Sequence, residues 1–230
     1  MIEQYSFELL LPREDIAIGI VLAQNLCLFP CGPLLEKRLQ ETLAQKKARG
    51  LNEEEEKFRA ASRLILRNGS YRPTGRSKPA NEYLLREAIE GEFPRINAAV
   101  DINNYISLKY MISISLWDID LAKSQKYCFR LGKPGESYIF NAGGQELKLD
   151  DLICGVALYE NEEKAIVTPV KDSLATKTTE HTKNTVMAIY YPLSAGNTDH
   201  LQKILGEARE LFEEARASYV ATKCIQPKSI

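Results

Sequence analysis

Hydrophobic and polar positions follow two periods along the chain, and the first stretch has the period of β-strands. Residues 7–11 and 16–23 are rich in aliphatic and β-branched side chains and are separated by the sequence Pro-Arg-Glu-Asp. This pattern predicts two strands joined by a turn. Because residues 16–23 contain no polar side chain, we expect that strand to be buried on both faces.

Helical patterns follow, and their ends carry capping residues. Residues 34–49 are predicted to form one helix. Asn52, with Glu55 three residues later, predicts a capping box at the start of a second helix. Ser77 is expected to cap a third helix, and Gly91 is expected to end it.

Residues 93–120 combine many small polar residues with many apolar ones, which is typical of a segment that lines a site. Asn97, Asp101 and Asn104 are spaced so that a helix places them on one face. Asn and Asp are poor residues for a helix interior. Their side chains therefore either contact a ligand or satisfy the backbone of neighbouring loops, and the sequence leaves both alternatives open.

The second half of the chain is predicted to be mostly β-structure. Ser113, Ser115 and Trp117 alternate with aliphatic residues, which predicts a strand with one apolar face and one small polar face. Short strands separated by turns then predict an antiparallel β region, interrupted by a polar segment at residues 171–184. A stripe of apolar residues predicts an amphipathic C-terminal helix over residues 199–222.

Chain length predicts the number of domains, and net charge indicates which classes of partner the chain attracts. The chain has 230 residues and a formal net charge of −1. We expect one α+β domain over residues 1–230, because this length suits one large domain. A nearly neutral chain has no overall attraction to nucleic acid or membrane, so binding of either kind would need a local patch.

Positive charge is concentrated between residues 57 and 95, where nine Lys and Arg residues accompany four Glu residues. One interpretation is a solvated helix surface with salt bridges. The other is a patch that contacts phosphates, since Lys and Arg neutralise a nucleic-acid backbone without reading its sequence. On the second interpretation, the predicted RNA contacts are Arg63, Arg72, Arg76 and Lys78.

Cysteine usage and motifs exclude several function classes. Five cysteines without a Cys-x-x-Cys pair, in a chain with two His residues, predict reduced, buried thiols and no metal site. The first residues lack a basic segment followed by an apolar one, and the best apolar run is too short to cross a bilayer. We therefore expect a cytoplasmic protein without membrane, metal or cofactor. The sequence contains no P-loop, dinucleotide fingerprint or nucleophile elbow.

Several short motifs occur in order along the middle of the chain: Arg72-Pro-x-x-x-Ser77, Glu82-x-Leu-Leu-Arg86, Pro94-x-Ile-Asn97, Val100-Asp101-x-x-Asn104, Asp118-x-Asp120, Pro-Gly-Glu at 134–136, and Thr176-Lys177-x-Thr-Glu180-x-Thr-Lys-Asn184. This series resembles the B3/B4 domain of the phenylalanyl-tRNA synthetase beta subunit, over roughly residues 16–192. The resemblance implies flanking helices around an antiparallel β-sandwich or open barrel of unusual topology. It also implies a pocket that hydrolyses tyrosine wrongly attached to phenylalanine tRNA.

The resemblance implies positions for that pocket. The family's Thr-Asn pair falls on Asn103 and Asn104, and a Gly of a later strand falls on Gly155. Its His falls on Ser115, and its Glu falls near Thr168, so this chain lacks both groups at those positions. Together with the polar helix and the neighbouring Trp, the predicted substrate pocket comprises Asn97, Asp101, Asn103, Asn104, Ser115, Trp117 and Gly155.

These observations favour a domain that binds tRNA or aminoacyl-tRNA, not DNA, and that deacylates mischarged aminoacyl-tRNA. Asn103 and Asn104 are the candidate catalytic residues, because positioned amides can hold a water molecule and polarise an ester carbonyl. Two alternatives remain open. One is a non-catalytic module that binds RNA or a free amino acid, and the other is a small-molecule sensor that does not contact RNA.

Overall fold

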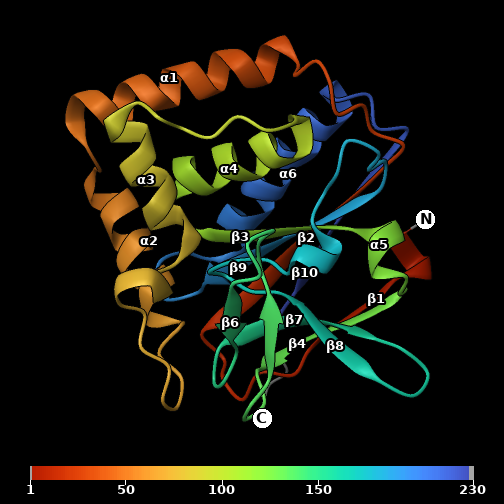
Figure 1. The fold of residues 1–230 in the computed structure, drawn as a ribbon. Coiled ribbons are helices and arrows are strands. Elements are labelled where there is room, and N and C mark those ends of the chain that lie inside the picture. The colour runs from red at the N-terminus through yellow and green to blue at the C-terminus, as the bar shows by residue number, and fades with distance from the viewer. Residues whose placement is uncertain (1, 228–230) are drawn as a thin grey trace.

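The structure is a computed structural model that describes residues 2–227, and it contains two four-stranded sheets, one hairpin and a layer of helices (Figure 1). The first sheet is antiparallel and has the order β10-β2-β9-β3, formed by β2 (Ile16–Gln24), β3 (Ser113–Asp118), β9 (Thr185–Pro192) and β10 (Tyr219–Ile225). The second sheet has the order β1-β4-β7-β8, formed by β1 (Ser6–Leu9), β4 (Lys126–Leu131), β7 (Ile153–Leu158) and β8 (Glu163–Val167). The hairpin pairs β5 (Ser137–Ile139) with β6 (Glu146–Lys148).

The helices of the described residues are α1 (Pro33–Arg49), α2 (Glu53–Leu64), α3 (Ala80–Glu90), α4 (Ala98–Tyr110), α5 (Ile119–Ala122) and α6 (Thr198–Glu214). Short 3₁₀ turns form η1 (Ile2–Gln4), η2 (Gly75–Ser77) and η3 (Leu174–Thr176). The fold is therefore α+β, as predicted, and its three sheets are open. Within residues 2–227, no helix has both the length and the apolar character needed to cross a bilayer.

Strand β2 lies between two hydrophobic cores. Its Ala17 and Val21 side chains pack with the helices, whereas Ile18 and Ile20 pack against the second sheet. Successive side chains of a strand point to opposite faces, so a strand between two cores needs apolar residues at every position. The prediction that this strand is buried on both faces is confirmed.

Helix α6 packs closely on β2 because Gly19 has no side chain. A Cβ atom at Gly19 would lie 2.9 Å from Leu201 Cδ1 and 3.2 Å from Leu205 Cδ2. Glycine in a strand often marks such a close approach. The helical layer of α1, α2, α4 and α6 is thereby held on one face of the first sheet, as Figure 1 shows.

Strands β1 and β2 follow each other in the chain but belong to different sheets. Strand β1 pairs with β4 in parallel, with Phe7 opposite Tyr127. Both edges of β2 are occupied by β9 and β10, so β1 obtains its backbone hydrogen bonds from another strand. The parallel β1-β4 pair departs from the expectation of a purely antiparallel sandwich.

The predicted C-terminal helix over residues 199–222 is too long. Helix α6 ends at Glu214, Arg216 adopts a left-handed φ of 59°, and the chain then forms β10. Tyr219 pairs with Gln24 of β2 and does not extend the helix. The edge of β2 offers unpaired backbone groups, and a strand can satisfy them where a helix cannot.

Helix ends follow local signals in two of three predicted cases. Asn52 Oδ1 accepts a hydrogen bond from Glu55 N, and Glu55 Oε2 accepts one from Asn52 N, both at 2.8 Å, so the capping box is confirmed. Gly91 ends α3 with a left-handed φ of 88°. Ser77 does not cap α3, because the N-cap residue is Pro79.

Candidate functional site

The connection between β8 and β9, residues 168–184, gathers polar groups from several elements. It contacts α4 through Asn97, β3 through Leu116 and the β5-β6 hairpin through Tyr138. These elements lie far apart in the sequence. The connection is therefore the point where the helical layer, the first sheet and the hairpin meet.

Asp172 lies within this connection and faces the backbone of β3. Its Oδ2 atom accepts a hydrogen bond from Leu116 N at 3.1 Å, and its Oδ1 atom accepts one from Thr168 N at 3.3 Å. Burial raises the pKa of Asp172 to about 6, although these hydrogen bonds and the charge of Lys177 act in the opposite direction. A carboxyl group that titrates near neutral pH can both accept and donate a proton.

Hydroxyl groups surround this part of the connection. Ser115 Oγ lies 2.9 Å from the Thr168 carbonyl oxygen and 3.1 Å from the Tyr190 hydroxyl, and the Tyr138 hydroxyl lies 3.2 Å from Thr168 Oγ1. Burial raises the pKa of Tyr138 and Tyr190 well above its ordinary value, so both phenols remain neutral hydrogen-bonding groups. We call Ser115, Tyr138, Thr168, Asp172 and Tyr190 the Asp172 cluster.

Three cationic side chains flank the Asp172 cluster. Burial lowers the pKa of Lys171, and the positive charges of Arg76 and Lys177 lower it further. Lys171 Nζ lies 4.0 Å from the centre of the Phe140 ring, and Lys177 Nζ donates to the Phe140 carbonyl oxygen. Among residues 2–227, none of the three cations forms a direct ion pair with a carboxylate. We call Arg76, Lys171 and Lys177 the cationic flank, and its charge is available to an anionic group.

Two of the predicted pocket residues on α4 bind backbone atoms. Asn97 caps the helix by accepting a hydrogen bond from Val100 N at 3.0 Å, while its amide group lies near the connection. Asp101 is 1% exposed and accepts hydrogen bonds from Ile96 N and Arg95 Nε, both at 2.8 Å. Both side chains thus accept hydrogen bonds from nearby backbone amides, and Asp101 also binds the Arg95 side chain.

Asn103 and Asn104 lie one helical turn further along α4. Asn103 Nδ2 donates to Asn104 Oδ1 at 3.2 Å. Asn103 is 9% exposed, and its Oδ1 atom has no hydrogen-bond partner within residues 2–227. A buried acceptor without a partner is uncommon, so this amide retains the capacity to bind a further donor. Their assignment as catalytic residues stays a prediction.

The remaining predicted pocket residues lie in or beside the β-structure. Ser115 belongs to the Asp172 cluster. Trp117 is 1% exposed and packs against Tyr127, with ring centres 5.3 Å apart. A Cβ atom at Gly155 would lie 2.5 Å from Val167 Cγ2, so Gly155 permits close packing of β7 on β8. The structure thus brings Asn97 and Ser115 to the same connection and places Trp117 within the core.

The predicted RNA contacts differ in their availability. Arg63 is held by Glu82, with 2.7 Å between Nε and Oε1, and Arg72 donates to two carbonyl oxygens of its own loop. Arg76 belongs to the cationic flank, and Lys78 is exposed at the end of η2. Part of the basic stretch is therefore a salt-bridged surface, and part of it is free to contact a phosphate.

Sequence reasoning missed most of the Asp172 cluster and two of its flanking cations. Lys171 and Asp172 begin the polar segment at 171–184, which composition alone distinguishes. A carboxylate shortly after Thr168, where the family places a Glu, is the signal that could have identified Asp172. Tyr138 and Tyr190 carry no such signal. Only the packing of the hairpin and of β9 brings the Tyr138 hydroxyl to Thr168 and the Tyr190 hydroxyl to Ser115.

Possible metal ligands and cysteine thiols were also located in the structure. No group of three or more His, Cys, Asp or Glu side chains within residues 2–227 is arranged to hold a metal ion. All five cysteines are free. Cys128 and Cys154 are buried, as expected, but Cys27 is exposed, so the prediction of buried thiols is wrong for that residue.

Comparison with known proteins identifies the family to which the chain belongs. The sequence model of the B3/4 domain matches residues 72–226, which is most of the chain, so the chain belongs to the B3/4 domain family. The resemblance predicted from the motifs is confirmed, although the match begins at Arg72 and extends beyond residue 192 into β10.

The chain is also similar to phenylalanine–tRNA ligase beta subunits. It is 27% identical over 143 residues to that of Staphylococcus haemolyticus (strain JCSC1435) and 26% identical over 143 residues to that of Staphylococcus saprophyticus subsp. saprophyticus. Both alignments cover 61% of this chain, but only 18% and 17% of the two relatives. The chain therefore corresponds to less than a fifth of these ligase subunits.

Proposed function

We propose that this protein binds the acceptor end of an aminoacyl-tRNA and hydrolyses the ester of a mischarged amino acid, with Asp172 as the general base. The observation that carries this proposal is the position of a carboxyl group with a pKa of about 6 beside Ser115, in a B3/4 domain. The similarity to ligase beta subunits supports a tRNA substrate.

The reaction needs little beyond a positioned water molecule, because the ester of an aminoacyl-tRNA is activated. Asp172 accepts a proton from the water molecule as the water oxygen attacks the ester carbonyl carbon. The bond to the ribose oxygen then breaks, and Asp172 returns the proton to that oxygen. The products are the free amino acid and the tRNA with a free ribose hydroxyl. Asp172 lies four residues after Thr168, near which the family's Glu falls, and it is therefore further from the end of β8.

In this proposal, the cationic flank binds the phosphates of the tRNA. Arg76, Lys171 and Lys177 lie close enough for the charges of Arg76 and Lys177 to lower the pKa of Lys171. A phosphate group bound among them would relieve this repulsion, and neutralisation of phosphates by Lys and Arg supplies most of the affinity of sequence-independent RNA binding. We therefore assign the terminal phosphates of the tRNA to these three side chains.

Deacylation assays test the catalytic part. Tyrosyl-tRNA(Phe) and a panel of other mischarged tRNAs are incubated with the full chain and with Asp172→Asn. We expect hydrolysis of at least one substrate, with a loss of about 10²-fold or more in the variant. Glu180→Gln is the matched control, because Glu180 lies on the same connection and its side chain is 80% exposed. If wild type hydrolyses no substrate above background, the catalytic proposal fails.

The second candidate is a module that binds tRNA without hydrolysis. It is favoured by Asn97 and Asp101, whose polar atoms bind backbone groups. Binding of uncharged tRNA at several salt concentrations separates the candidates. Arg76→Glu should weaken binding and reduce its salt dependence under both, whereas turnover is expected only under the first. If tRNA does not bind even at low salt, both candidates are overturned.

A further inference from the structure

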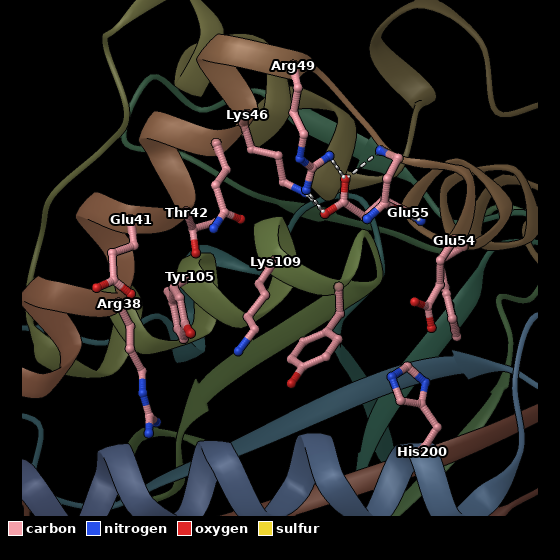
Figure 2. Close-up of a pocket in the computed structure, with 14 residues that line it drawn as sticks. Arg38, Glu41, Thr42, Lys46, Arg49, Glu54, Glu55, Tyr105, Lys109 and His200 are labelled. Carbon is pink, nitrogen blue, oxygen red and sulfur yellow. Dashed lines mark hydrogen bonds and ion pairs between the residues drawn. The ribbon is translucent and has the colours of Figure 1, made fainter.

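A cavity lies in the helical layer, away from the Asp172 cluster. It has a volume of about 440 Å³ and is lined by residues of α1, α2, α4 and α6 together with Asn52 (Figure 2). This volume lies in the range of small-molecule sites. The family match begins at residue 72, and α1 and α2, which provide most of the lining, precede that residue. Family membership therefore does not account for the cavity.

Each cation of the cavity already contacts a carboxylate, and Lys46 and Arg49 share one. On one side, Lys46 Nζ lies 2.7 Å and Arg49 Nη2 lies 2.9 Å from the same Oε1 atom of Glu55. On the α6 side, Lys109 Nζ lies 2.8 Å from both carboxylate oxygens of Glu207. Arg38, also on the α6 side, lies 2.8 Å from Glu210. An anionic ligand would have to compete with these carboxylates.

Two carboxylates of the cavity are unpaired. Glu41 of α1 and Glu54 of α2 both line it, and neither forms an ion pair with another residue between 2 and 227. Figure 2 shows them at opposite sides of the cavity, with Tyr105 and Lys109 between them. Unpaired negative charge is therefore open to a ligand at two separate points.

Between these carboxylates, the wall offers a hydroxyl group and aromatic rings. Thr42 is 7% exposed and lines the cavity, and its hydroxyl points into the cavity in Figure 2. A hydroxyl oxygen can accept a hydrogen bond from a ligand ammonium group. Phe58, Tyr105 and Tyr110 line the cavity as well. Lys109 Nζ already lies over the Tyr105 and Tyr110 rings, so the contribution of the aromatic wall is apolar contact with methylene groups.

We propose that this cavity binds an aliphatic diamine or polyamine, with one ammonium group at Glu41, another at Glu54, and the aliphatic chain along the aromatic wall. Such a ligand matches each feature: two separated carboxylates without ion-pair partners, a hydroxyl acceptor and an apolar surface. A zwitterionic amino acid matches only half of them, because its carboxylate finds every cation of the cavity paired.

Titration calorimetry on the full chain, freed of nucleic acid and held at fixed ionic strength, tests the proposal. The probes are putrescine, cadaverine and spermidine, with n-butylamine, 1,4-butanediol, succinate and tyrosine as comparisons. We expect at least one diamine or polyamine to bind at least tenfold more tightly than n-butylamine, and the uncharged, anionic and zwitterionic probes not to bind. Equal affinity for n-butylamine, or binding of succinate or tyrosine, would overturn the assignment.

Variants locate the ligand. Glu41→Gln and Glu54→Gln should each weaken binding by roughly threefold or more, as expected for a partly exposed ion pair, and the double variant should weaken it further. Glu53→Gln is the matched control, because Glu53 neighbours Glu54 but does not line this cavity. An equal effect of the control would show that polyamines bind the acidic surface at large, and the proposal would be wrong.

Histidine resonances give a readout that does not depend on affinity. The chain has two His residues. His200 lines the cavity, whereas the side chain of His181 is 86% exposed and lies on the β8-β9 connection. Saturating diamine should shift the imidazole signals of His200 and leave those of His181 unchanged. A shift of His181 alone, or of neither residue, would contradict binding at this cavity.

Discussion

The carboxyl group of Asp172 accepts a hydrogen bond from the backbone amide of Leu116, with 3.1 Å between Oδ2 and N. This contact joins the β8-β9 connection to the strand that carries Ser115. It places a titratable group where the protein otherwise presents hydroxyl groups and backbone. The pKa of this group therefore affects how the stability of the protein depends on pH.

Asp172→Asn should change how the stability of the protein depends on pH. Burial raises the pKa of Asp172 from 3.8 to about 6, so the folded state holds this proton more tightly than the unfolded state does. The corresponding stabilisation is complete below pH 3.8 and is lost as the pH rises to about 6. It amounts to roughly 3 kcal/mol for a shift of about two pKa units.

Urea unfolding of wild type and Asp172→Asn at pH 4 and pH 7 measures this effect. The stability of the variant relative to wild type should increase with pH over this interval. A difference that stays constant would show that Asp172 titrates normally. If the proposed function holds, deacylation should also rise with pH through about 6, since the base must be ionised to accept a proton.

Glu207→Ala should destabilise the fold strongly. The Tyr105 and Tyr110 hydroxyls each donate to the Glu207 carboxylate at 2.6 Å, and Lys109 Nζ lies 2.8 Å from it. Removal of the carboxylate leaves these donors without an acceptor between α4 and α6. We expect a loss of about 2–4 kcal/mol in the free energy of unfolding.

Glu210→Ala on the same helix is the control for Glu207. Its carboxylate is 53% exposed and pairs with Arg38, so its loss should cost less than about 1 kcal/mol. The hydrogen bonds also lower the pKa of Glu207 against the effect of burial. This part of the stability is present above the ordinary pKa of 4.5 and is lost as the pH falls below it. Equal losses in the two variants would contradict the special role of Glu207.

Gly19→Ala and Gly206→Ala should have opposite effects. The new Cβ atom at position 19 would lie 2.9 Å from Leu201 Cδ1, so either the Leu201 side chain or α6 must shift. We expect a cost of about 1–3 kcal/mol from this overpacking. At Gly206, on α6, a Cβ atom meets nothing within 4 Å, and alanine should stabilise the helix by up to about 1 kcal/mol. Thermal unfolding of both variants checks the pair.

Asn52→Ala and Ser77→Ala distinguish a real helix cap from an apparent one. Asn52 Oδ1 accepts a hydrogen bond from Glu55 N at 2.8 Å, so its loss should cost about 1 kcal/mol. Ser77 precedes α3 but does not cap it, so Ser77→Ala should change stability by less than about 0.5 kcal/mol. Chemical denaturation gives both values, and a larger loss at Ser77 would show that its side chain caps α3 in solution.

The candidate site was only partly predictable. Ser115, Asn97 and Arg76 were named from the sequence and lie at or beside the β8-β9 connection. Asp101 was expected in the same pocket but binds Arg95 and the backbone of Ile96. Helical spacing gives the face on which a side chain lies, but it does not say what that face meets.

Features that depend on near neighbours in the chain could be predicted from the sequence. These are the capping box at Asn52, the end of α3 at Gly91, the burial of β2 on both faces and the apolar stripe of α6. Each depends on contacts within a few residues or on the period of one element, and both are encoded locally.

The contacts between segments that are distant in the chain could not be predicted in this way. Strand β1 pairs with β4, and residues after α6 turn back to become β10, because the backbone groups at strand edges must be satisfied by whichever segment reaches them. The same holds for Asp172, whose raised pKa comes from burial against a strand more than 50 residues earlier in the chain. Burial and long-range hydrogen bonds are properties of the assembled fold, so no local pattern could have specified them.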